Sequence, residues 1–181
     1  MKFFGVLCIV LLYSICSGQS YRPADATAPS KIVITSKDEP GEPLVVTGRV
    51  FAEDGRTPLA GVSVYVYHTD KRGYYSGEST GNSNPRLRGW MRTDEQGTYE
   101  YRTIKPGAYP QGGAPAHIHY VVTGPGYKEK VFEIVFEGDP QLSDRIKADA
   151  RNEDSGFSLR PITRDKDGTL RVVQDIKLRR E

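Results

Sequence analysis

Short β-prone segments, separated by turn sequences, constrain the fold of this chain of 181 residues more than any other feature. The segments are rich in β-branched and aromatic residues, and several alternate apolar with polar side chains. They cover residues 31–35, 44–50, 62–67, 98–104, 117–123, 131–136 and 170–178. Turns rich in glycine and aspartate lie between them, and only the short polar stretch 142–151 has a helical pattern. The pattern predicts an all-β, antiparallel β-sandwich with long functional loops and at most one short helix.

The amino-terminal residues predict export. Lys2 supplies a positive charge, residues 3–15 form an apolar run too short to cross a bilayer, and the small residues Ser17 and Gly18 suit cleavage. We therefore expect a signal peptide over residues 1–18, a linker over 19–30 and one domain over 31–181, in a secreted or periplasmic protein without a membrane span. Lipidation of Cys16 would anchor the chain instead, but the bulky residues before this cysteine make it the minor alternative.

Composition excludes two further classes of protein. The chain has 25 lysines and arginines against 23 aspartates and glutamates, and no block of basic residues, so we expect no nucleic-acid partner. Both cysteines, Cys8 and Cys16, lie in the predicted signal peptide. The predicted mature domain therefore has no disulfide framework.

A pair of histidines points to a metal site. His117 and His119 are two of the three histidines in the chain, and on a strand their side chains project from the same face. Histidines with this spacing can also lie at a surface, or one of them can be a satisfied core residue. Tyrosines strengthen the metal interpretation, because Tyr109 precedes the pair and a second turn after a core strand carries Tyr74 and Tyr75.

Tyrosine ligands would narrow the choice of metal. A phenolate is a hard anion, and its pKa near 10 means that a strong Lewis acid is needed to keep it deprotonated at neutral pH. Ferric iron meets this requirement, whereas zinc more often binds histidine, cysteine or carboxylates. Two imidazoles and two phenolates would leave positions open for a substrate on a non-haem Fe(III) ion.

The chain resembles the intradiol ring-cleavage dioxygenases, the family that includes protocatechuate 3,4-dioxygenase and catechol 1,2-dioxygenase. The segments that carry the resemblance are 58–77, 87–110, 116–119, 136–140 and 174–180, in the order in which the family has them. The resemblance implies that an Fe(III) ion is held by four residues, Tyr75, Tyr109, His117 and His119. It also implies that Tyr109 leaves the metal when a catechol binds and accepts a proton from it. The implied partners are a small aromatic diol and O2, and a homo-oligomer is compatible with the chain.

Other residues near these motifs have expected roles outside the metal site. Tyr74 would flank the mouth of the substrate pocket or cover the edge of the sheet, and His68 is expected to be structural. The family has an arginine where this chain has Ala114 and a glutamine where it has Glu133. Both changes disfavour an anionic transition state, so they point to a divergent or more open substrate pocket. A replacement charge could come from one of three arginines in neighbouring segments, Arg88, Arg92 or Arg102.

Three functions are compatible with these patterns. The leading hypothesis is an exported intradiol dioxygenase that opens a catecholic ring, between its two hydroxyl-bearing carbons, to a muconate-type diacid. A second is an inactive relative that binds iron and catechols, because Ala114 and Glu133 depart from the family. A third is a transthyretin-like binding module, which the opening "Pro-Leu-Ala-Gly-Val" at residues 58–62 also favours.

Overall fold

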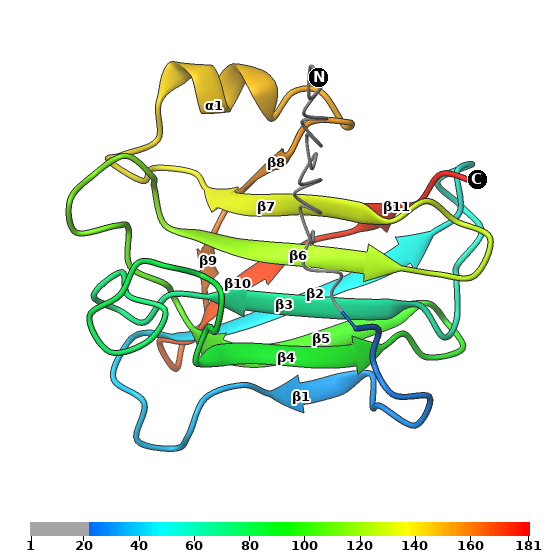
Figure 1. Ribbon diagram of the computed structural model, residues 1–181, viewed down its shortest axis with the longest axis horizontal. Helices are drawn as coiled ribbons and strands as arrows, with labels where there is room; N and C mark the ends of the chain where they lie inside the picture. The colour runs from blue at the N-terminus through cyan, green and yellow to red at the C-terminus, as the bar shows by residue number, and fades with distance from the viewer. Residues whose placement is uncertain (1–21) are drawn as a thin grey trace, which may run out of the picture.

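Two β-sheets packed face to face form the protein, as the computed structural model shows for residues 22–181 (Figure 1). One sheet has the strand order β4-β3-β6-β7-β8. Its strands are β3 (Ser63–His68), β4 (Leu87–Arg92), β6 (His117–Thr123), β7 (Lys130–Phe136) and β8 (Phe157–Arg160). The other sheet has the order β1-β5-β2-β10-β9, with β11 also paired to β2. Its strands are β1 (Lys31–Val33), β2 (Pro43–Phe51), β5 (Thr98–Ile104), β9 (Thr163–Arg164), β10 (Leu170–Val173) and β11 (Ile176–Lys177).

Alternation along the strands places the core between the two sheets. In β6, Ile118, Tyr120 and Val122 are completely buried and pack on the facing sheet, whereas His119 points to the opposite face. Polar groups inside the core are paired. The Tyr101 and Tyr120 hydroxyls lie 2.7 Å apart, so one donates to the other. The predicted β-sandwich is confirmed.

The single helix among the described residues is α1 (Asp144–Asp149), inside the predicted stretch 142–151. Ser143 caps its first turn, because its hydroxyl accepts a hydrogen bond of 3.3 Å from the backbone N–H of Ile146. None of the helical residues in the described part of the chain forms a segment long and apolar enough to cross a membrane.

The strand prediction was right for the central strands and incomplete at the edges. The expected ranges 98–104 and 117–123 coincide with β5 and β6, but β4, β8 and β9 were missed, and the segment 170–178 divides into β10 and β11. The long central strands pair antiparallel as predicted, whereas β1, β8, β10 and β11 each join a neighbour in parallel. Strand β4 escapes prediction because Gly89 interrupts its pattern. A Cβ at Gly89 would lie 2.4 Å from Cδ1 of Ile32, so the glycine allows β1 to approach.

The amino-terminal segment bears on two of the predicted boundaries. The predicted signal peptide, residues 1–18, lies outside the described residues. The described part of the predicted linker is residues 22–30, and it packs against the domain. The backbone N–H of Ala24 donates to the Ser63 hydroxyl (2.8 Å), and the Arg92 guanidinium donates to the carbonyl oxygens of Ala24 and Asp25. The boundary at residue 30 stays a prediction.

Candidate metal centre

Two loops at one end of the sandwich carry the tyrosines that the sequence singles out. The loop after β3 holds Tyr75 and the loop after β5 holds Tyr109, and both loops lie at the left of Figure 1. Gly107 brings them together: its N–H donates to the carbonyl of Asp70 (2.9 Å), and its own carbonyl accepts from the Thr69 hydroxyl (2.8 Å). A Cβ at Gly107 would lie 2.5 Å from the carbonyl oxygen of Lys71. Only glycine permits this approach of the two backbones.

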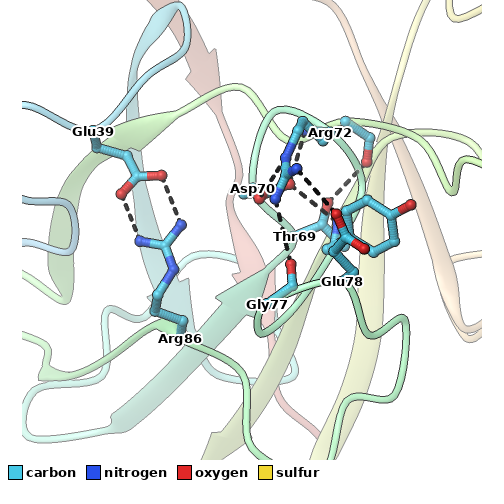
Figure 2. A network of polar contacts seen from close by, with 9 residues as sticks. Glu39, Thr69, Asp70, Arg72, Gly77, Glu78 and Arg86 are labelled. Carbon is cyan, nitrogen blue, oxygen red and sulfur yellow. Dashed lines mark hydrogen bonds and ion pairs between the residues drawn. The ribbon is translucent and has the colours of Figure 1, made fainter.

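Polar contacts hold the Tyr75 loop in place (Figure 2). The Asp70 carboxylate accepts hydrogen bonds from the backbone N–H groups of Arg72 (2.8 Å) and Tyr74 (3.1 Å). Arg86 donates its backbone N–H to the carbonyl of Tyr75 (2.8 Å). Its guanidinium forms a two-pronged pair with Glu39 at 2.6 and 2.8 Å, which Figure 2 shows. The hydrogen bond from Arg86 outweighs the effect of burial and lowers the pKa of Glu39. The position of Tyr75 is therefore tied to the segment between β1 and β2.

Four side chains converge where these loops meet β6. The Tyr75 hydroxyl lies 3.0 Å from the Tyr109 hydroxyl, 3.1 Å from Nε2 of His117 and 2.6 Å from Nε2 of His119. The two Nε2 atoms are 3.1 Å apart. Tyr75 and His117 are buried, whereas Tyr109 and His119 are half-buried. The structure thus brings together the four residues that the sequence nominated as metal ligands.

Hydrogen bonds at the opposite nitrogens fix the tautomers of the two histidines. Nδ1 of His117 lies 2.7 Å from the carbonyl oxygen of Pro115, and a carbonyl only accepts, so Nδ1 carries the proton. Nδ1 of His119 lies 3.1 Å from a carboxylate oxygen of Glu133, which likewise accepts. With the proton at Nδ1, each neutral imidazole has its Nε2 lone pair available to the cluster. Burial, together with neighbouring His119, also lowers the pKa of His117 and favours its neutral form.

The donor set fits a metal ion. Donors in adjacent positions around an ion with bonds of ~2 Å lie about 2.8 Å apart, close to the separations found here. Burial, followed by the hydrogen bond with Tyr109, raises the pKa of Tyr75 far above its usual value. Without a cation Tyr75 therefore stays protonated, and a strong Lewis acid is needed to make it a phenolate.

Glu133 lies beside this cluster and not within its donor set. It forms with His117 and His119 a group whose ligand atoms lie within 4.8 Å of one another. However, its carboxylate contacts Nδ1 of His119, on the side of the ring turned away from the Tyr75 hydroxyl. Burial would raise the pKa of Glu133, but the hydrogen bond with His119 and the nearby imidazoles outweigh it and lower the pKa. Glu133 therefore acts on the cluster through His119.

The other residues nominated for the pocket lie outside the four-residue cluster. Arg88 donates to the Asn84 side chain (2.5 Å) and to the carbonyl of Pro85 (2.9 Å), and Arg92 binds backbone carbonyls of the amino-terminal segment. Arg102 belongs to the other sheet, where it pairs with Glu100. The half-buried Tyr74 lies under the Arg72 guanidinium, at 5.3 Å from the ring centre. Ala114 is half-buried, and its carbonyl accepts from the Tyr109 N–H at 3.3 Å.

One residue that contacts the cluster was missed from the sequence. The Tyr67 ring stacks on the His119 imidazole, with ring centres 4.3 Å apart and planes at 10°. Tyr67 lies directly across from His119 in the pairing of β3 with β6. The alternation Val64, Tyr65, Val66, Tyr67 puts both tyrosines on the face opposite the core, which is the signal that could have identified it.

Comparisons with known proteins agree with this geometry. A family model described as "Dioxygenase" matches residues 16–158. Catechol 1,2-dioxygenase 1 of Acinetobacter lwoffii is 35% identical over 158 aligned positions, and the match covers 77% of this chain and 49% of that protein. Catechol 1,2-dioxygenase 2 of the same organism is 38% identical over 122 aligned positions, and the match covers 59% of this chain and 44% of that protein.

A solved structure matches over nearly the whole chain. It is the dioxygenase domain of a dioxygenase and carbohydrate-binding protein fusion from Streptomyces sp. SirexAA-E, with 26% identity and a TM-score of 0.66. The match covers 91% of this chain and 96% of that domain. By contrast, the chain spans about half the length of the curated relatives that it matches. The sandwich, the match over residues 16–158 and the relatives together show that the chain belongs to the intradiol ring-cleavage dioxygenase family.

Proposed function

We propose that the protein is an exported, iron-dependent intradiol dioxygenase that cleaves a catecholic ring with O2 to a muconate-type diacid. The convergence of two tyrosine hydroxyls and two histidine Nε2 atoms, with neighbouring separations of 2.6–3.1 Å, is the observation that carries the proposal. Ferric iron bound there would supply Lewis acidity, a template for both catechol oxygens and activation of the ring toward O2. The relatives, two catechol 1,2-dioxygenases, support the same reaction class, and the amino-terminal sequence supports export.

The two tyrosines have different surroundings and, we infer, different roles. Tyr75 is buried and its loop is tied down by Arg86, so it serves as a permanent ligand. Tyr109 is half-buried, and the glycines at 112 and 113 follow it in the same loop. Tyr109 is thus the more exposed of the two, and as a metal-bound phenolate its oxygen would take the proton of a substrate hydroxyl when the diol binds. His117 and His119 hold their positions through Nδ1 and keep Nε2 available throughout.

The decisive experiment follows the visible spectrum of the protein after reconstitution with a ferric salt. A phenolate bound to ferric iron gives a coloured charge-transfer band, which should appear in the wild type, persist in Tyr74→Phe and be strongly reduced in Tyr75→Phe. Simple catechols added without oxygen should shift the band, and admission of O2 should then yield a ring-opened diacid.

The alternatives give distinct results in the same experiment. A spectral shift with catechols but no oxygen uptake or product would identify an inactive iron- and catechol-binding relative. A protein that stays colourless with ferric salt would refute the iron site and favour a binding module of the transthyretin-like kind.

A further inference from the structure

The carboxylate of Glu133 lies outside the four-residue cluster and contacts one of its members, His119. We propose that Glu133 is a positioning residue: it locks His119 in the Nδ1–H tautomer and makes its Nε2 a stronger metal donor than Nε2 of His117. The proposal rests on the proposed metal site. Its premise is that a carboxylate behind a histidine ligand orients the ring and raises the basicity of the opposite nitrogen.

The sheet itself delivers Glu133 to His119. The two residues are direct partners in the antiparallel pairing of β6 with β7, and both side chains project from the face opposite the core. The carboxylate Oε1 lies 3.1 Å from Nδ1 of His119. The His119 side chain is 12% exposed and the Glu133 side chain is 30% exposed, so water screens the contact only in part. Among residues 22–181, Glu133 forms no ion pair with any lysine or arginine.

The two histidines of the cluster are therefore unequal. Nδ1 of His117 donates to a neutral acceptor, the carbonyl of Pro115, at 2.7 Å. Nδ1 of His119 donates to an anionic acceptor, which draws the proton toward itself and leaves more electron density on Nε2. The Tyr67 ring stacks on the face of the His119 imidazole, with ring centres 4.3 Å apart, and restricts rotation of that ring. His119 would therefore be the stronger nitrogen donor of the two.

The alternative role for Glu133 is that of a direct ligand, with His117 and His119. The hydrogen bond to Nδ1 argues against it, because the carboxylate would have to leave this nitrogen and reach the opposite side of the ring. The two roles make different predictions for the isosteric amide. Glutamine keeps an oxygen that can accept from Nδ1–H but loses the negative charge.

The test compares Glu133→Gln, Glu133→Ala and the matched control Glu137→Gln, a change at an exposed carboxylate just beyond the end of the same strand. Two readouts are used: ¹⁵N NMR of the histidine tautomers in the metal-free protein, and the ferric dissociation constant from competition with a chelator. We expect Glu133→Gln to keep the Nδ1–H tautomer of His119 and to weaken iron binding by about 10- to 100-fold. Glu133→Ala should lose the preferred tautomer and weaken binding further, and Glu137→Gln should match the wild type. Thermal unfolding of the metal-free variants shows whether each one folds.

Two results would overturn the proposal. Either Glu133→Ala retains the wild-type tautomer and iron affinity, or Glu133→Gln abolishes iron binding while the tautomer is unchanged, as for a lost ligand. The tautomer readout needs no metal, so it tests the role of Glu133 even where the wild type fails to bind ferric iron. Failure of the metal site and failure of this proposal are therefore separable.

Discussion

Acidification should destabilise the protein through His68, a histidine at the end of β3 that the metal cluster does not use. The ring is completely buried. Nδ1 of His68 donates to the carbonyl oxygen of Thr69 at 2.7 Å, so Nε2 of the neutral ring carries no proton. Nε2 lies 2.6 Å from the Thr103 hydroxyl and accepts a hydrogen bond from it. Burial, against smaller opposing contributions, lowers the pKa of His68 from 6.5 to about 4. The folded protein therefore contains neutral His68 at pH values where the unfolded chain binds a proton.

The magnitude follows from the linkage between protonation and folding. The unfolded chain binds the extra proton between pH 6.5 and about 4, so this contribution to stability is complete above that range and is lost as the pH falls through it. Each pH unit is worth about 1.36 kcal/mol, so the full loss is about 3 kcal/mol. This is a large share of the ~5–15 kcal/mol that stabilises a typical domain.

Urea unfolding, followed by circular dichroism at a series of pH values, measures this effect. The variant His68→Gln removes the titrating group, so carboxylates and the other histidines contribute equally to both proteins. We expect the wild type to lose about 3 kcal/mol more than the variant between pH 7.5 and pH 4. Parallel pH dependences for the two proteins would refute the reasoning.

Three further predictions concern the loops and the cluster. Gly107→Ala should cost about 1–3 kcal/mol of unfolding free energy and weaken ferric binding, because the added Cβ would lie 2.5 Å from the carbonyl oxygen of Lys71. The control Gly156→Ala, where a Cβ would have open space around it, should change neither quantity. Arg86→Gln should cost about 1–3 kcal/mol in thermal unfolding, because it leaves the Glu39 carboxylate without its two hydrogen bonds. Tyr109→Phe should keep the charge-transfer colour that the Tyr75 phenolate supplies but slow single-turnover ring opening by about 10²–10⁴-fold. An unchanged rate would exclude Tyr109 as the proton acceptor.

The core strands were predictable because their information is local. Alternation in β5 and β6 sets which side chains face the partner sheet, and a shift by one residue would turn the core residues outward. The edge strands carry little such information. Strand β4 includes Gly89 and charged residues, β8 is short and only partly buried, and β9 is two exposed residues. Their pairing depends on neighbours distant in the sequence, as with Ile32 over Gly89.

The shared face of the two histidines was predictable for a similar reason, and the surroundings of the cluster were not. The spacing of His117 and His119 puts them on one face of a strand whatever the rest of the chain does. The resemblance to a family then singled out Tyr75 and Tyr109. Nothing local in the sequence, however, places Glu133 behind His119 or directs Arg88 toward Asn84 and away from the cluster.

By itself, then, the sequence determined a β-sandwich and put His117 and His119 on one face of a strand, and the family resemblance added Tyr75 and Tyr109 as expected metal donors. The tertiary structure decided how these donors are held. Pairing of β6 with β7 placed a carboxylate at Nδ1 of His119, and the contact at Gly107 brought the Tyr75 and Tyr109 hydroxyls within 3.0 Å. The physical reason is that side-chain alternation acts over neighbouring residues. Strand register and loop closure instead join residues far apart in the chain, and packing of the whole domain sets them.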